Sequence, residues 1–141
     1  MRASTVRKPP SKAPVTDGVQ AGAGLRTFAR IAGRWKLPAS DAMALLGVES
    51  RSTYYELLER ARGGREVKGL SRDQLDRLSY VLGIYEAIRV LFPHSEETRD
   101  GWVSRANTAQ MFGGRSPLEI MRVSMIGLYQ TFAHVAAARA W

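Results

Sequence analysis

Apolar residues recur along most of the chain at intervals of three and four positions, which is the period of an amphipathic α-helix. The first clear run contains Leu25, Phe28, Ile31 and Trp35. Proline and glycine interrupt the pattern at several points and so divide it into separate helices. No segment shows the strict apolar–polar alternation of a half-buried β-strand. The sequence therefore predicts an all-α fold.

The first part of the chain lacks the helical pattern. Pro9, Pro10 and Pro14 stand there among lysine, serine, threonine and glycine. Such a composition buries too little apolar surface to offset the entropy lost on ordering, so we expect a disordered basic tail. Gly63 and Gly64, which end the helix predicted to begin after Ser50, mark a second boundary. The expected domains are then the tail (residues 1–24), an N-terminal domain (residues 25–68) and a C-terminal domain (residues 69–141).

Residues 37–60 have the pattern of a helix-turn-helix, in which two short helices meet at a tight turn. Ser40 or Asp41 can cap the first helix, and Gly47 can supply the turn. Ser50 can then cap the second helix. Two short helices joined by a turn also occur in many helical bundles, so this pattern leaves both interpretations open.

The formal net charge is +8, and most of it lies in the first half of the chain. Residues 1–24 contribute +3 and residues 25–68 contribute +4, whereas residues 69–141 contribute only +1. A basic half attracts a polyanion such as DNA, although it can also be a solvated surface with no such partner. In a helix-turn-helix, the N-terminal part of the second helix enters the major groove. We therefore predict four DNA-binding residues: Arg51, Ser52, Thr53 and Tyr55.

The C-terminal half begins with a strong helix start. Ser71 is followed three residues later by Gln74, which is the spacing of a capping box. The helix predicted to follow extends to about Phe92 and carries apolar residues on two sides. The two stripes are Leu75, Leu78, Leu82 and Tyr85, and Val81, Ile84, Ile88 and Leu91. One side can pack within the domain and the other against a partner subunit.

Pro93 ends this helix, and we expect a shorter helix over residues 95–105 that carries Trp102. After a loop at residues 107–114, the sequence Ser116-Pro117-Leu118-Glu119 combines an N-cap, a proline at the first helical position and a capping-box glutamate. This is the clearest helix start in the chain. The helical pattern then continues toward the C-terminus, with a break near Ser124 that can cap it again.

The loop and helix start at residues 107–121, with the sequence NTAQMFGGRSPLEIM, resemble the core motif of the Xre/MbcA/ParS family of bacterial antitoxins. Other blocks follow in the family's order, so that the resemblance covers roughly residues 27–132. These blocks are residues 45–48 (LLGV), 52–55 (STYY), 70–78 (LSRDQLDRL), 82–85 (LGIY) and 91–93 (LFP), with Trp102 beyond them. The chain departs from the family at residues 122–124, where many members have a glycine-containing turn, and its last helix is less polar than theirs.

The resemblance implies an antitoxin of a type II toxin–antitoxin system. Members of the family neutralise RES-domain toxins, which consume NAD or transfer its ADP-ribose, by covering the toxin's active site. Many members also bind promoter DNA and so regulate their own operon, and they form homodimers and larger assemblies with the toxin. The alternative is a stand-alone helix-turn-helix regulator without a toxin. The motif implies seven toxin-binding residues: Asn107, Phe112, Gly113, Gly114, Arg115, Ser116 and Pro117.

Catalysis, metal binding and a membrane location find little support in the sequence. The chain has no cysteine, and its two histidines, His94 and His134, lack the spacing of a metal site. It also has no nucleophile motif and no phosphate-binding glycine loop. No apolar run approaches the roughly 20 residues of a spanning helix, and the N-terminus does not resemble a secretory signal. We therefore expect a cytoplasmic protein that is not an enzyme and needs no cofactor.

Overall fold

A computed structural model describes residues 18–140, which form seven α-helices, one 3₁₀ helix and no β-strand. The all-α prediction is confirmed. The helices are α1 (Gly18–Arg34), α2 (Ala39–Leu46), α3 (Arg51–Arg62), α4 (Arg72–Leu91), α5 (Glu96–Gly101), the 3₁₀ helix η2 (Trp102–Ser104), α6 (Pro117–Met121) and α7 (Met125–Arg139). None of these helices is both long enough and apolar enough to cross a membrane.

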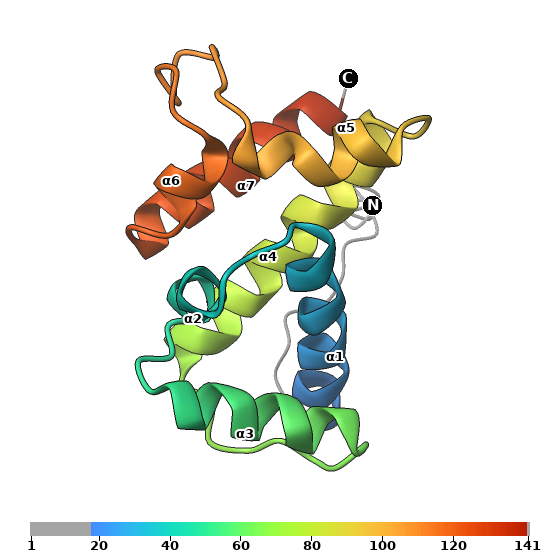
Figure 1. Ribbon diagram of the computed structural model, residues 1–141, viewed down its shortest axis with the longest axis vertical. Helices are drawn as coiled ribbons and strands as arrows, with labels where there is room; N and C mark the ends of the chain where they lie inside the picture. Colours follow the sequence, from blue (N-terminus) through green and yellow to red (C-terminus); the bar gives the residue numbers. More distant parts are fainter. Residues whose placement is uncertain (1–17, 141) are drawn as a thin grey trace, which may run out of the picture.

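The molecule is elongated, and its two ends are built from different halves of the chain. In Figure 1, α3 lies across the lower end, whereas α5, α6 and α7 form the upper end. Helices α1 and α4 run between the two ends, and α2 lies against α4. The loop between η2 and α6 projects from the upper end. The two predicted functional segments are therefore held at opposite ends of one molecule.

The prediction of a disordered tail is wrong for residues 18–24, which form the first turns of α1. Ala21 is buried there, and the carbonyl oxygen of Gly18 accepts a hydrogen bond of 3.1 Å from the backbone N–H of Val67. Gly22 lies close to the same loop, because an added Cβ would stand 3.3 Å from the carbonyl oxygen of Arg65. The helix is thus stabilised by a segment more than forty positions away. The remainder of the predicted tail lies outside the described residues.

Helix α4 is buried on two sides, as its two apolar stripes predict. It packs against α1 and α2 on one side and against α7 on another. The expectation that a partner subunit covers the second side is wrong, because α7 of the same chain lies there. Phe132 of α7 packs where Gly83 leaves space, since a Cβ on Gly83 would stand 2.6 Å from the Phe132 ring. The ring of Tyr80 also lies 5.3 Å from that of Phe132 and 5.5 Å from that of Tyr129.

One hydrophobic core runs through both halves of the described chain. Leu25 and Phe28 of α1 belong to it, and so do Ile84 of α4 and Leu128 of α7. Each of these side chains is fully shielded from solvent. The core therefore continues across the boundary that the sequence predicts at residue 68, and α4 contributes to it along its whole length.

Serine side chains cap five of the α-helices. The predicted capping boxes at Ser71 and Ser116 are both present, and Ser124 caps α7 after the predicted break. Each cap satisfies one of the free N–H groups in the first turn of its helix. The remaining two caps are Ser50 on α3 and Ser95 on α5.

The cap predicted at Ser40 or Asp41 is wrong. Helix α2 starts at Ala39 after Pro38, and no side chain caps it. The carboxylate of Asp41 instead faces Arg122 of the C-terminal half, with 3.1 Å between the Asp41 Oδ1 and Arg122 Nη1 atoms. The shorter helix predicted over residues 95–105 is divided between α5 and η2.

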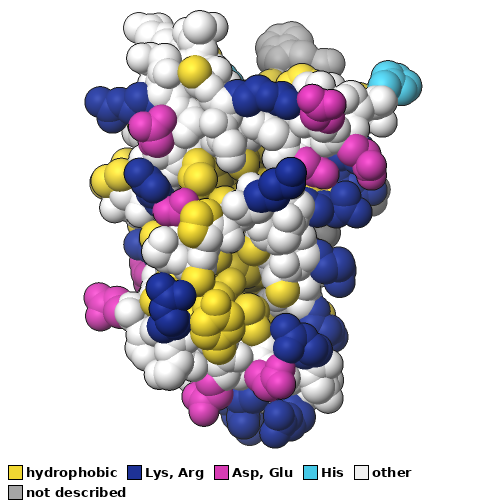
Figure 2. All heavy atoms as spheres, viewed as in Figure 1, with side chains coloured by type: hydrophobic (Ala, Val, Ile, Leu, Met, Phe, Trp, Pro, Cys, Tyr) yellow, Lys and Arg dark blue, Asp and Glu magenta, His cyan; other side chains and the backbone are white. Residues whose placement is uncertain are grey.

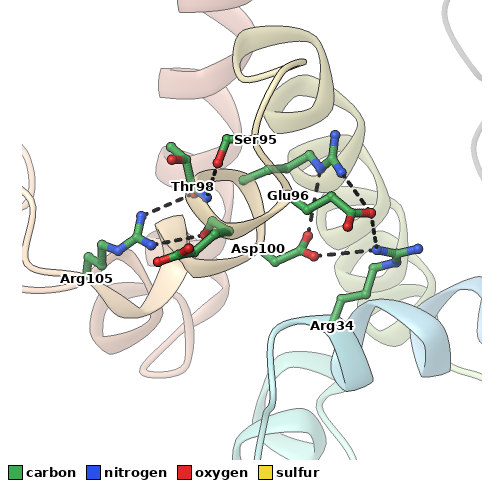
Figure 3. Close-up of polar contacts among 8 residues, drawn as sticks. Arg34, Ser95, Glu96, Thr98, Asp100 and Arg105 are labelled. Atoms are coloured by element: carbon green, nitrogen blue, oxygen red, sulfur yellow. Dashed lines mark hydrogen bonds and ion pairs between the residues drawn. The ribbon is translucent and has the colours of Figure 1, made fainter.

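A second group of ion pairs joins the halves at the C-terminal end of α1 (Figure 3). Arg34 lies 3.5 Å from the carboxylate of Asp100 and 3.7 Å from that of Glu96, both on α5. The Arg105 guanidinium donates to the carbonyl oxygens of Glu97 and Thr98 and so holds α5 against the following turn. Nearly half of the Arg34 side chain is exposed, so this group orients α5 more than it stabilises the fold.

Gly127 should resist substitution by alanine. A Cβ at this position would stand 2.2 Å from the backbone oxygen of Ile120, so α6 and α7 would have to separate. We expect Gly127→Ala to lower the free energy of unfolding by about 1–3 kcal/mol, as overpacking does. Chemical denaturation measures this change.

Gly33→Ala is the matched control, because Gly33 is also helical but has no atom within 4 Å of an added Cβ. Alanine's higher helix propensity should raise the free energy of unfolding there by up to about 1 kcal/mol. Equal effects at the two positions would contradict the close approach of α6 and α7.

Candidate functional site

The turn between α2 and α3 has the geometry that the sequence predicts. Gly47 has a φ of 71°, which glycine adopts without strain. Its N–H donates to the carbonyl oxygen of Ala44 at 3.2 Å, and the N–H of Val48 donates to that of Met43 at 3.0 Å. These bonds close the end of α2 and direct the chain into α3. The pair α2–α3 is therefore a helix-turn-helix.

Two polar side chains of α4 hold this turn, and sequence reasoning missed both roles. The side-chain amide of Gln74 donates to the carbonyl oxygen of Gly47 at 3.0 Å. Arg77 donates to the carbonyl oxygen of Ala44 at 3.3 Å and is itself held by Asp73 at 2.8 Å. The spacing of Asp73 and Arg77 indicates an ion pair on one helix, but only the fold brings Arg77 to the turn.

Helix α3 presents one side to the core and the other to solvent. Its buried residues are Tyr54, Leu57, Leu58 and Ala61. Arg26 of α1 fixes its C-terminal end by donating to the carbonyl oxygen of Ala61 at 2.8 Å. Burial raises the pKa of Tyr54, with a further contribution from Tyr55, so the Tyr54 phenol stays protonated at neutral pH. The opposite, outward side of α3 is exposed among residues 18–140.

The structure brings the four predicted DNA-binding residues together on this outward side. Arg51, Ser52, Thr53 and Tyr55 are all exposed. At 100° per residue, Ser52 lies near the middle of the exposed side, whereas Arg51 and Thr53 lie toward its two edges. Figure 2 shows Lys and Arg side chains gathered around the lower end of the molecule, near α3 and the loop after it, with Asp and Glu between them.

At the other end, Asn107 closes the loop between η2 and α6. Its N–H donates to the carbonyl oxygen of Arg115 at 3.0 Å, and its own carbonyl oxygen accepts from the N–H of Gly114 at 2.9 Å. The Asn107 side chain also accepts a bond of 2.9 Å from the N–H of Ala109. Gly113 and Gly114 have φ angles of 59° and 89°, with no atom within 4 Å of an added Cβ. Glycine is required here by backbone conformation and not by crowding.

Three of the seven predicted toxin-binding residues are buried. The Phe112 ring lies between Trp102 and His134, with ring centres 5.9 and 5.3 Å away. Ser116 and Pro117 are also shielded from solvent. These three residues support the loop from beneath. Of the other four predicted residues, Gly113, Gly114 and Arg115 are exposed and Asn107 is partly exposed.

The start of α6 is fixed by charge as well as by hydrogen bonds. The Glu119 carboxylate accepts from the N–H of Ser116 at 2.8 Å, and the Ser116 hydroxyl accepts from the N–H of Glu119 at 3.2 Å. The bonds to Ser116 lower the pKa of Glu119, and the nearby Arg122 and Arg115 lower it further. Glu119 is therefore ionised at neutral pH and holds the loop's last turn in place.

An exposed group of apolar side chains lies beside the loop and was not predicted. Val123, Ile126 and Tyr129 are 77%, 69% and 50% exposed, and we call this group the apolar ridge. Tyr129 also lines a shallow groove, whose other walls are Met111, Gln130, Ala133 and His134. The groove thus joins the loop, through Met111, to the ridge. The only sequence signal was the replacement of a small turn by residues 122–124.

No group of three or more His, Asp or Glu side chains within residues 18–140 could hold a metal ion. His134 faces Phe112, so its ring serves the packing of the loop. The two ends of the molecule present different surfaces: an exposed helix of a helix-turn-helix at one end, and the loop between η2 and α6 with the apolar ridge at the other. This combination defines a helix-turn-helix protein with a second, helical interaction domain.

Comparison with known proteins identifies both domains. The antitoxin Xre-like helix-turn-helix domain matches residues 14–83, and the antitoxin Xre/MbcA/ParS C-terminal toxin-binding domain matches residues 87–141. The chain belongs to the Xre/MbcA/ParS antitoxin family, which confirms the resemblance. The chain is also similar to the uncharacterized protein y4oB of Sinorhizobium fredii, with 36% identity over 127 residues, which make up 89% of this chain and 92% of the relative. No solved structure matches the chain.

Proposed function

We propose that this antitoxin neutralises a RES-domain toxin that consumes NAD or transfers its ADP-ribose, by covering the toxin's active site. The observation that carries the proposal is the apolar ridge, which lies within the part of the chain matched by the toxin-binding domain. Isoleucine and valine exposed this fully are unfavourable in water and are typical of a surface that a partner covers. The loop contributes open glycine backbone and the five N–H donors of Arg115, which suit a carboxylate on the toxin.

The same chain is proposed to bind promoter DNA through α3 and so to regulate its own operon. Support comes from the helix-turn-helix geometry and from the exposure of Arg51, Ser52, Thr53 and Tyr55 on one side of α3. The N-terminus of α3 also offers free backbone N–H groups to a phosphate. Both the toxin and the promoter would be met in the bacterial cytoplasm.

A homodimer is proposed through a groove between α1 and α4. Ile31, Leu82 and Tyr85 line the groove together with Arg30 and Arg89, and Glu86 is also present. Val90, nearly half exposed, lies one turn beyond Glu86 on α4. Arg34 also lines the groove, so three arginines stand beside one glutamate, and Glu86 of one copy can pair with an arginine of a second copy turned by a two-fold axis.

The elongated shape supports the same dimer. Helices α1 and α4 run along the length of the molecule, while α3 lies at one end (Figure 1). A two-fold axis parallel to that length keeps both copies of α3 at the same end, where they can meet two half-sites of one duplex. The two toxin-binding ends then lie together at the opposite end, which permits a larger assembly with the toxin.

Ile126→Asp should abolish toxin neutralisation. Ile126 is in the first turn of α7, where an acidic residue suits the helix dipole, so the fold should remain intact. We expect toxin binding to weaken about 30-fold or more, as at an interface hot spot. Co-expression with a RES-domain toxin encoded beside this gene, with cellular NAD as the readout, measures the effect.

Val90→Lys is the control, because it places a charge on another exposed apolar residue away from the ridge; Val90 is 47% exposed and Ile126 is 69% exposed. It should protect NAD as well as the wild-type chain does. If the wild-type chain neither binds the toxin nor restores NAD, the antitoxin proposal is wrong and the stand-alone regulator is favoured.

Arg51→Ala should weaken DNA binding in a salt-dependent way. A side chain at the edge of the exposed side of α3 is placed for a phosphate, so its loss should lower affinity about tenfold and reduce the salt slope by about 1. Fluorescence anisotropy with the duplex upstream of the gene tests this at several salt concentrations. Arg139→Ala, at the far end on α7, should leave both quantities unchanged. Unaltered affinity and slope for Arg51→Ala would remove Arg51 from the interface.

Arg30→Glu should convert a dimer to monomers. Arg30 is exposed, and its hydrogen bond is to the Thr27 hydroxyl on the same helix, so reversal of its charge should leave the fold intact. Sedimentation equilibrium should show a dimer dissociation constant at least tenfold higher for Arg30→Glu and for Val90→Lys, but unchanged for Ile126→Asp. A dimer broken by Ile126→Asp alone would move the interface to the apolar ridge.

A further inference from the structure

The middle of the outward side of α3 is acidic, which is unusual for a surface proposed to meet DNA. The helix buries Tyr54, Leu57, Leu58 and Ala61. The opposite line, at 100° per residue, runs through Ser52, Glu56 and Glu59. All three side chains are exposed. The arginines of α3, which are Arg51, Arg60 and Arg62, lie to the sides of this line.

The two glutamates differ in their surroundings. Glu59 forms an ion pair with Arg62 one turn further along the helix, so its charge is largely compensated. The Glu56 side chain has no ion pair or hydrogen bond with any residue in the part of the chain that the structure describes. It also lies in the N-terminal half of α3, one turn beyond Ser52, which is the half that enters the major groove in helix-turn-helix proteins.

A carboxylate in the major groove has a narrow choice of partners. It can only accept hydrogen bonds, and the phosphates on both sides repel it. Cytosine offers the N4 amino group with no acceptor beside it on the same edge. Adenine also offers an amino group, but its N7 acceptor lies next to that group and repels a carboxylate. Guanine in the same position presents the acceptors O6 and N7, and thymine presents O4.

We propose that Glu56 is a specificity-determining residue that selects cytosine at one position of each half-site. The inference rests on the proposed DNA binding of α3 and names the base that one of its residues reads. Glu56 accepts a hydrogen bond from the cytosine N4 amino group, and its charge weakens binding to every duplex that lacks this donor. Arg51 and Arg60 at the sides of α3 bind phosphates and supply affinity, whereas Glu56 supplies discrimination.

The experiment compares base preference in the full chain and two variants. The wild-type protein first selects its consensus site from a random-sequence duplex library. Fluorescence anisotropy then measures binding to the consensus duplex and to each duplex with a single-base change. The wild-type chain should prefer cytosine about tenfold or more at one position per half-site. Glu56→Ala should lose that preference at that position alone, and Glu56→Gln should shift it toward adenine, which glutamine reads through N6 and N7. Both variants should bind random duplex several-fold more tightly.

Glu59→Gln is the matched control, because it removes the same charge from the same line of α3 but from a side chain already paired with Arg62. It should leave the cytosine preference unchanged. If the wild-type chain selects a consensus and Glu56→Ala selects the same one with the same discrimination, Glu56 does not read a base, and the DNA-binding proposal stands. If the wild-type chain selects no sequence and binds no duplex, both proposals fail together. Equal unfolding temperatures for the wild-type chain and the three variants show that the comparison is between folded chains.

Discussion

The structure depends on the burial of α4 from more than one side. Its apolar residues pack against α1 and α2, and Gly83 lets Phe132 of α7 approach its backbone. Because packed interiors deform little, α4 cannot shift against the N-terminal half of the chain without disturbing its packing against the C-terminal half. The first family domain ends at residue 83 and the second begins at residue 87, so the boundary between them lies within α4. The two domains are distinct in sequence and continuous in packing.

This arrangement brings α4 into contact with both the helix-turn-helix and the apolar ridge. Near its N-terminus, Gln74 and Arg77 hold the backbone of the helix-turn-helix turn. Near its middle, Tyr80 lies against Tyr129, which belongs to the apolar ridge. The ridge therefore packs, through Tyr129, on the same helix that holds the turn before α3.

Sequence reasoning succeeded where structure is determined locally. The capping boxes at Ser71 and Ser116, and the turn at Gly47, depend on residues within a few positions of each other, so the pattern alone identifies them. It failed at residues 18–24, because the order of that segment comes from contact with the loop at residues 65–67. It also failed at Asp41, whose carboxylate is engaged by Arg122, eighty-one positions away. Long-range partners of this kind leave no local signal.

The candidate surfaces also divide into those that the local sequence predicts and those that depend on long-range packing. Exposure of Arg51, Ser52, Thr53 and Tyr55 could be anticipated from the period of α3, because its apolar residues define the buried side. The apolar ridge could not be anticipated from the sequence, because Val123, Ile126 and Tyr129 are residue types that usually lie in a core. Only the path of α6 and α7 leaves them exposed to solvent. Phe112 shows the converse case: the motif contains it, yet its ring faces inward and supports the loop. A motif identifies the segment that meets the partner, whereas the packing beneath that segment decides which of its side chains form the surface.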